Sequence, residues 1–421
     1  MAWPSGETRV CKISIDHSSV AGSLSNFPAL LTAADLPDEL LEGTYGRSDG
    51  GDIRFATDLA GNNPIHFEVV AGTFAQNANP SLATAEIWVG IPTADTGSNG
   101  DVYIAYGNPS LTAPAANDAT FGSQGVWANY LGVWHFATVS GSPSMADSTA
   151  NNVSWTNNNG ATAAAGQIDG AVEFDGSSQY LSQTALNLTS GYDWSLWIQS
   201  PTAAGGSGAN WVMSAASSAS VGFCWNHPQS TFSQAIYQQD SSGNYYPAKI
   251  TSSLSTNTEY LVSGTWDGST LTVWLNGSSE ATASVSSITA ATGIATLAAV
   301  PGPANLLGCI IDELRFSAVP LSANWKATEY NNQSNPAAFW TVGTPQNIGD
   351  TTASFSAAGT ATSAMHGAST FAGHFAATGT ATSAMTGAST AAASFAAEGV
   401  ATSNVRSPST NDFGTGLFAY V

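Results

Sequence analysis

Charged residues are scarce in this 421-residue chain, and their shortage excludes several classes of protein. Asp, Glu, Lys and Arg together make up 9% of the sequence, whereas about 25% is usual for soluble domains. The eight Lys and Arg residues are outnumbered by 29 Asp and Glu residues, which gives a formal net charge of −21. Binding to nucleic acid requires a basic face that contacts phosphates, so we expect no nucleic-acid partner.

Cysteine is scarce as well, and long apolar runs are missing. The three cysteines, Cys11, Cys224 and Cys309, are an odd and sparse set that does not make a disulfide framework. We therefore expect buried thiols that pack as small hydrophobic groups. We also find no signal peptide and no run long enough to cross a bilayer, so we expect no membrane span.

The stretch between Glu259 and Gly277 contains the strongest strand and turn signals in the chain. Side chains alternate in character from 271 to 275, and Asp-Gly at 267–268 and Asn-Gly at 276–277 frame this segment. These dipeptides supply the positive φ angles that tight hairpin turns require. The stretch thus predicts three antiparallel strands in a meander.

Three segments resemble the laminin-G-like, concanavalin A-like domains. They are the hairpin stretch, Gly170–Gly176 (GAVEFDG) and Ile311–Phe316 (IDELRF). The resemblance implies a jelly roll, with Trp194 and Trp197 on opposite faces of one inner strand. It does not imply a particular function, because lectins, hydrolases, adhesins and passive spacers all use this fold.

The N-terminal region resembles a domain of unassigned activity that precedes laminin-G-like domains in bacterial surface proteins and phage structural proteins. Five segments carry this resemblance, in the family's order: Ile15–Ser18, Asn26–Pro28, Gly51–Phe55, Ile87–Val89 and Tyr106–Pro109. The resemblance implies a second β domain and no chemistry. Two short helices are expected beside the strands, one at Pro37–Leu41 that ends at Gly43 and one that is capped by Ser322.

The C-terminal region repeats itself. Phe355, Phe375 and Phe395 occupy equivalent places in successive units, which fixes the period at 20 residues. Residues within each unit alternate as they do in strands. We favour β-repeats that stack on each other, on sister chains or on a partner, and the alternative is a flexible low-complexity linker. Similar repeats occur in phage tail and capsid-associated proteins.

These patterns predict an all-β fold with four parts. An N-terminal β-sandwich domain of unknown function is expected at 1–112 and a linker at 113–124. A laminin-G-like, concanavalin A-like jelly roll is expected at 125–345. The β-repeat tail, with a C-terminal anchor, is expected at 346–421.

The first candidate activity is glycoside hydrolysis, because concanavalin A-like folds include glucanases. Those enzymes resemble one another in a Glu-x-Asp-x-x-Glu strand, and retention of configuration requires two carboxyl groups about 5–5.5 Å apart. The nearest match starts at Glu173 and Asp175 but has Ser178 in place of the second Glu. We therefore expect no catalytic residues, and a hydrolase with other carboxylates remains the less favoured alternative.

Calcium binding is the second candidate property. In the concanavalin A-like family an Asp of the last strand often holds a structural calcium ion, and Asp312 occupies the matching position. Asp147 and its Asn-rich loop offer a second set of oxygen ligands. The alternative for Asp312 is that it pairs with Arg315 or caps a turn, and a structural role of this kind is the favoured interpretation of Asp147.

Sugar binding is the third candidate property. Lectin sites place aromatic faces on exposed loops beside amide and carboxylate groups, and most of the 13 tryptophans must instead pack in the core. Trp155, Trp225, Tyr245 and Tyr246 have polar, turn-rich surroundings. They are the candidate carbohydrate-binding residues.

The sequence favours a non-enzymatic bacteriophage virion protein, as a fibre, decoration or tail-associated subunit. An extracellular type of architecture without an export signal is consistent with release in a particle. Its expected partners are other virion subunits, sister chains in a homo-oligomer and a host-surface polysaccharide. The alternative is a glycan-binding adhesin at the bacterial cell surface or outside the cell.

Overall fold

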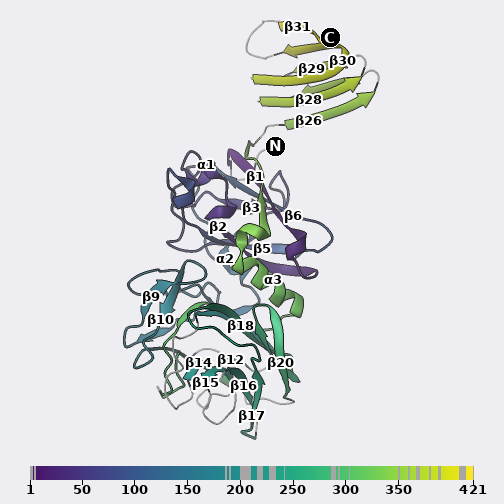
Figure 1. Cartoon of the computed structure of the whole chain (residues 1–421). Coiled ribbons are helices and arrows are strands. Elements are labelled where there is room, and N and C mark those ends of the chain that lie inside the picture. The colour runs from purple at the N-terminus through teal and green to yellow at the C-terminus, as the bar shows by residue number, and fades with distance from the viewer. Residues whose placement is uncertain are drawn as a thin grey trace. The chain divides into compact units, whose positions relative to one another are not determined.

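The computed structural model confirms the all-β expectation (Figure 1). It describes residue 3, residues 6–348 with gaps, and the strands between residues 351 and 420. The gaps lie at 185–186, 189–190, 200–209, 216–220, 227–233, 241, 286–290, 293 and 303. The chain forms two compact units. One contains residues 11–344, and the other joins residues 1–10 to residues 345–421.

The first β domain consists of two sheets around one core. The first sheet has the order β24 (Trp340–Val342), β1 (Arg9–Ile15), β6 (Gly100–Tyr106) and β3 (Arg54–Ala56), with β25 (Gln346–Asn347) also paired to β1. The second has the order β2 (Leu24–Thr32), β5 (Glu86–Ala94) and β4 (Phe67–Val69). Because β24 pairs antiparallel with β1, the chain returns to this domain after completing the second one.

The second β domain consists of two larger sheets. One has the order β20 (Ser278–Ser284), β19 (Thr270–Leu275), β18 (Glu259–Trp266), β13 (Tyr192–Gln199), β23 (Ile310–Ser317), β10 (Gly170–Glu173) and β9 (Thr162–Ala165), with β7 (Tyr130–Trp134) paired to β23. The other has the order β17 (Tyr245–Lys249), β16 (Ala235–Gln239), β15 (Val221–Asn226), β14 (Asn210–Ala215), β22 (Ala295–Leu297), β11 (Tyr180–Gln183) and β8 (Thr156–Asn158). A small separate sheet contains β12 (Asn187–Leu188) and β21 (Ala291–Thr292).

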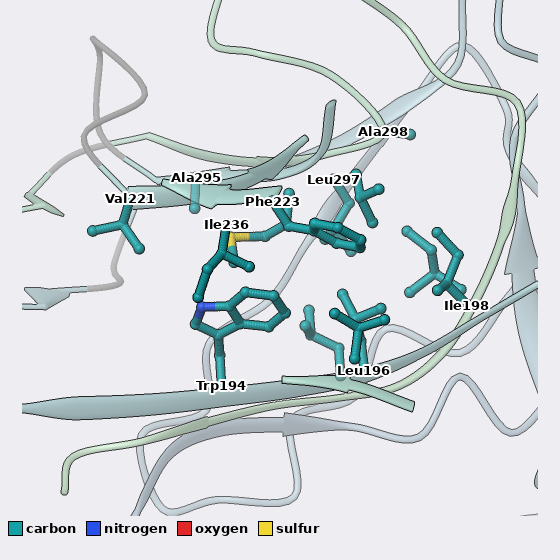
Figure 2. Packing of buried hydrophobic residues seen from close by; sticks show 14 of the residues in the cluster. Trp194, Leu196, Ile198, Val221, Phe223, Ile236, Ala295, Leu297 and Ala298 are labelled. Carbon is teal, nitrogen blue, oxygen red and sulfur yellow. The ribbon is translucent and has the colours of Figure 1, made fainter. Parts of the chain in front are cut away.

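The core of the second domain lies between its two large sheets. Figure 2 shows Trp194, Leu196 and Ile198 of β13 facing Phe223 and Leu297 of the opposite sheet. Trp197 points the other way and belongs to a separate hydrophobic cluster. The prediction that the two tryptophans lie on opposite faces of one strand is therefore confirmed. The three cysteines are buried free thiols, as expected.

The hairpin stretch folds as the predicted meander of β18, β19 and β20. Asn276 and Gly277 both have positive φ angles, 49° and 77°, and form a two-residue turn. The Asp-Gly turn is longer than a two-residue hairpin, because β18 ends at Trp266 and β19 begins at Thr270. Asp267 holds this turn by accepting a hydrogen bond from the Thr270 N–H at 2.8 Å.

Helices are few and short. The α-helices are α1 (Asp38–Leu41), α2 (Ser123–Val126), α3 (Ala323–Ser334) and α4 (Pro336–Phe339). The 3-10 helices are η1 (His17–Ser19), η2 (Ala33–Asp35) and η3 (Pro80–Leu82). The two predicted helices are present: α1 follows Pro37, and α3 begins after Ser322, whose hydroxyl accepts a hydrogen bond from the Trp325 N–H. In the part of the chain that the structure describes, no helix is long and apolar enough to cross a membrane.

The C-terminal strands are β26 (Thr351–Ala358), β27 (Ala361–His366), β28 (Thr370–Thr378), β29 (Ala381–Thr386), β30 (Thr390–Arg406) and β31 (Gly414–Tyr420). Strands β26, β28 and β30 run parallel, and residues 20 positions apart pair with each other. Phe355, Phe375 and Phe395 therefore occupy one row across three strands. Strand β31 pairs antiparallel with β30.

Candidate functional site

The structure corrects the prediction that Trp155 and Trp225 are exposed sugar-binding residues. Their side chains are only 4% and 5% exposed, and both belong to the core of the second domain. Trp155 lies edge-on against Trp134, with 5.4 Å between ring centroids. Their polar sequence neighbours were misleading, because successive residues of an extended segment point to opposite faces.

Tyr245 and Tyr246 begin strand β17, next to the turn that connects it to β16. Tyr245 is 49% exposed and Tyr246 is half-buried. The Tyr246 hydroxyl donates a hydrogen bond to Asp240 Oδ2 at 2.9 Å, and the Asn244 side chain donates to the same oxygen at 3.0 Å. This group, which we call the β17 platform, is Asp240, Asn244, Tyr245 and Tyr246. It combines an exposed aromatic ring with a carboxylate and an amide.

The hydrogen bonds of the β17 platform shift the pKa values of two of its members. The side chain and backbone N–H of Asn244 both donate to Asp240 and lower the pKa of that carboxyl to about 2. The same carboxylate raises the pKa of the Tyr246 hydroxyl, because it accepts that proton. The platform is thus negatively charged and internally ordered at neutral pH.

Asp147 organises its own loop. Its carboxylate accepts hydrogen bonds from the backbone N–H groups of Val133, Thr149 and Val153 at 2.8–3.0 Å, and from the Thr149 hydroxyl at 2.9 Å. Donors therefore surround both oxygens. Asp175 of the incomplete hydrolase motif likewise accepts three backbone hydrogen bonds from the turn that follows it.

Asp312 lies in β23 and its side chain is buried, with 1% of the residue exposed. Its Oδ2 accepts a hydrogen bond from the Ile168 N–H at 2.9 Å, and its Oδ1 has no hydrogen-bond partner. Burial and the nearby Glu313 raise the pKa of this carboxyl well above its usual value. Arg315 pairs with Glu313 and Glu329. Calcium binding at Asp312 stays a prediction.

The most concentrated chemistry in the described residues lies where the two β domains meet. A β-bulge in β23, opposite Leu196 of β13, gives Glu313 a positive φ of 51°. The extra residue lets Leu314 face the core of the second domain while Glu313 and Arg315 meet on the other side of the sheet. A positive φ is uncommon for a residue with a side chain and often marks a functional or strained position.

Residues from both domains surround Glu313 there. We call the group Glu68, Glu86, His135, Glu313 and Arg315 the junction cluster. His135 Nδ1 lies 2.7 Å from Glu313 Oε1 and 3.1 Å from Glu86 Oε1, and His135 Nε2 lies 3.4 Å from Glu68 Oε2. Arg315 Nη2 donates to Glu313 Oε2 at 2.5 Å.

Aromatic rings enclose the junction cluster. The Arg315 guanidinium lies 4.1 Å from the ring centroid of Trp88 and 5.0 Å from that of Trp127, a cation–π geometry. The His135 ring stacks on Trp88, with 5.8 Å between centroids and 21° between planes. The two tryptophans also belong to the hydrophobic cluster of the domain junction, with Leu30, Val133 and Trp197.

The electrostatics of the junction cluster are set by burial and by opposing charges. Burial raises the pKa of Glu86 to about 8, although His135 opposes this shift. Burial also disfavours ionisation of Glu313, but the positive charges of His135 and Arg315 outweigh it and lower its pKa to about 2. Burial disfavours the His135 imidazolium, and the carboxylates of Glu313 and Glu86 outweigh it and raise its pKa. The protonated His135 ring therefore lies between the carboxyl groups of Glu86 and Glu313.

A second ionic group adjoins the junction cluster through helix α3. Lys326 donates hydrogen bonds to Asp193 of β13 and, at 3.3 Å, to Glu329. Glu329 Oε1 lies 3.6 Å from Arg315 Nη1. The side chain of Asn332, also on α3, exchanges two hydrogen bonds with the backbone of Leu30 in the first domain. Helix α3 thus fastens the two β domains together.

Sequence reasoning missed the junction cluster. Its one local signal is the pair Glu313 and Arg315, two charged residues in a strand that is otherwise apolar apart from Asp312 and Ser317. Glu68, Glu86 and His135 lie far from that strand in the sequence. Only the fold brings them together.

Two known families match parts of the chain. Residues 174–325 match the laminin G model of the Concanavalin A-like lectin/glucanases superfamily. Residues 49–158 match a domain of unknown function, DUF2341. No curated protein matches the chain.

Among the solved structures to which the chain is similar are the following two proteins. One is the receptor binding domain of botulinum neurotoxin C/D mosaic serotype, with 11% identity and a TM-score of 0.40, over 49% of this chain and 52% of that chain. The chain thus spans about half the length of that domain. The other is domain 4 of an extracellular arabinanase from Geobacillus stearothermophilus in complex with arabinotriose, with 18% identity and a TM-score of 0.39, over 48% of this chain and 98% of that one. The family matches confirm both expected resemblances: the chain carries a concanavalin A-like domain, preceded by a domain of unknown function.

Proposed function

We propose that this chain is a non-enzymatic bacteriophage virion protein, a fibre, decoration or tail-associated subunit, whose concanavalin A-like domain contacts glycans of the host surface. The observation that carries the glycan part is the β17 platform. Tyr245 presents an exposed ring beside the carboxylate of Asp240 and the amide of Asn244.

Sugar recognition requires these chemical groups. An aromatic face packs against the C–H face of a pyranose, while amide and carboxylate groups bind its hydroxyls. In the β17 platform, hydrogen bonds from Tyr246 and Asn244 fix the carboxylate of Asp240, so little side-chain entropy is lost when a ligand binds. Charged residues are few and the net charge is negative, which favours neutral polysaccharides over anionic ones.

The virion part of the proposal is supported by the C-terminal strands. Parallel strands that pair residues 20 positions apart build a repetitive sheet, and in the described topology β26 and β27 are the outermost strands of that sheet. Outer strands are places where further strands can add. We propose that sister chains or other virion subunits extend the sheet there and make the protein a homo-oligomer within the particle.

Glycan binding is tested with the purified full chain on an array of bacterial surface polysaccharides. We expect binding that falls at least tenfold in Tyr245→Ala, because the exposed ring is removed. Tyr45→Ala is the matched control, since Tyr45 is 38% exposed on the first domain, and it should bind like the wild type. Equal losses in both variants, or no binding by the wild type, would contradict the proposal.

A further inference from the structure

We infer that the junction cluster binds one divalent transition-metal ion, with Glu86, His135 and Glu313 as its ligands. Each offers one ligand atom, and these atoms lie within 4.8 Å of one another. All three residues are at most 4% exposed. The Nδ1 of His135 faces Oε1 of both glutamates, at 3.1 Å and 2.7 Å. These are hydrogen-bond distances, and a small outward shift of the side chains would let one ion replace the shared proton and contact all three ligand atoms.

Two of the three ligands, Glu86 and Glu313, are oriented by a hydrogen bond from a second group, as metal ligands in proteins usually are, and His135 has a carboxylate near its other nitrogen. The other nitrogen of His135, Nε2, lies 3.4 Å from Glu68 Oε2. The Trp88 indole N–H donates to Glu86 at 2.8 Å. Arg315 donates to Oε2 of Glu313, which leaves Oε1 on the side of the imidazole. The supporting shell of a metal site is therefore already built.

The charge that the cluster has once its protons leave matches that of a divalent ion. Three carboxylates, those of Glu68, Glu86 and Glu313, share one permanent positive charge, that of Arg315. Metal binding would release the protons of Glu86 and His135, and the five side chains would then carry a formal charge of −2, which one divalent ion cancels. A buried group with uncompensated charge is costly.

An unpaired buried atom points to the same ligand. Glu86 is 1% exposed, and its Oε2 has no hydrogen-bond partner. Buried carboxylate oxygens are nearly always paired with a donor or a metal ion. Coordination by an ion between Glu86 and His135 would satisfy this oxygen or its neighbour Oε1.

The cluster also adjoins a hollow on the first domain. This hollow, of about 530 Å³, is lined by residues that include Glu68, Val70 and Phe121. The Glu68 side chain is 13% exposed, and its Oε2 lies 3.4 Å from His135 Nε2. Glu68 therefore lies between this hollow and the buried ligands.

The donor set favours a particular class of ion. One imidazole with two carboxylates suits zinc, manganese or ferrous iron, whereas calcium prefers six to eight oxygen ligands. We take zinc as the probe. The site differs from the calcium position predicted at Asp312, because its ligands come from both β domains.

The test is the metal content and zinc affinity of the full chain after chelator treatment, zinc loading and gel filtration. The expected result is about one tightly bound zinc per wild-type chain, and none in Glu86→Gln. Glu68→Gln, which alters only the supporting shell, should weaken binding roughly 10–100-fold. Asp240→Asn is the matched control for surface binding, because it removes an exposed carboxylate elsewhere, and it should keep the zinc.

X-ray absorption by the zinc-loaded wild type provides a readout that does not depend on how well the variants fold. The inference predicts a zinc shell of oxygen and nitrogen atoms with one imidazole. Three results would overturn it: a wild type without tightly bound metal, equal stoichiometry in a folded Glu86→Gln, or a shell without imidazole. If the wild type binds no metal tightly, the carboxylates of the cluster are neutralised by protons on Glu86 and His135 instead.

Discussion

At the scale of single residues, burial separates two groups of aromatic side chains in the second domain. Trp155 and Trp225 have the polar sequence neighbours of a binding site but pack inside the sandwich. Tyr245 has similar neighbours and stays 49% exposed. Composition around a residue therefore does not reveal which face of a strand it occupies, whereas the pairing of its strand does.

Trp155→Ala tests the assignment of that residue to the core. Removal of a buried tryptophan should lower the free energy of unfolding by about 3–5 kcal/mol, measured by guanidinium denaturation. Tyr245→Ala, which truncates an exposed ring, should change it by less than about 0.5 kcal/mol. If Trp155→Ala keeps the stability of the wild type but loses glycan binding, Trp155 is an exposed binding residue and its assignment to the core is wrong.

The carboxyl of Asp240 provides a pH test of the β17 platform. Its pKa is lowered to about 2 in the folded protein, compared with about 3.9 in an unfolded chain. Its contribution to stability is therefore complete above pH about 4 and is lost as the pH falls towards 2. Carbon NMR of the aspartate carboxyls should show this low midpoint, and Tyr246→Phe should raise it. A midpoint near 4 in the wild type would contradict the hydrogen-bonded platform.

At the scale of secondary-structure elements, the sequence correctly predicted those turns and helix starts that depend on adjacent residues alone. The Asn-Gly turn, the α1 turn after Pro37 and the Ser322 cap each depend on the conformational preferences of a few adjacent residues, and all three are present. The bulge at Glu313 was not predictable. Its cause is the pairing of β23 with β13, which begins over 100 residues earlier in the chain.

The glycine that opens strand β10 makes a further prediction. A Cβ atom on Gly170 would lie 2.4 Å from Thr138 N and 2.6 Å from Ala137 C, which are backbone atoms that cannot easily move. Gly170→Ala should therefore destabilise the protein by about 1–3 kcal/mol in chemical denaturation.

Gly97→Ala is the control for that substitution. The nearest atom to a Cβ at Gly97 is a side-chain oxygen of Asp95 at 3.3 Å, and this side chain lies on the surface, where it can shift. We expect a change within about 0.5 kcal/mol. If both variants unfold at the same denaturant concentration as the wild type, the close packing of β10 against residues 137–138 is contradicted.

At the scale of the whole molecule, the sequence indicated which domains are present but not how the two β domains meet. Family motifs sufficed to place a concanavalin A-like domain after a second β domain. The junction cluster was hidden, because Glu86, His135 and Glu313 come from three strands or strand ends that lie far apart in the sequence. The chain has few positively charged residues, and two of them, Arg315 and Lys326, are fully buried in this region. Composition alone does not predict such burial of charged side chains.

The central claim is that the chain is a component of a virus particle. Its most direct test is quantitative peptide mass spectrometry of density-purified particles from the source culture, with the particle-free supernatant and the cell envelope as comparison fractions. The account predicts that peptides of this chain follow the particle band in a fixed ratio to the other virion proteins. Peptides found only in the supernatant or with the envelope would contradict it and favour a surface or secreted adhesin.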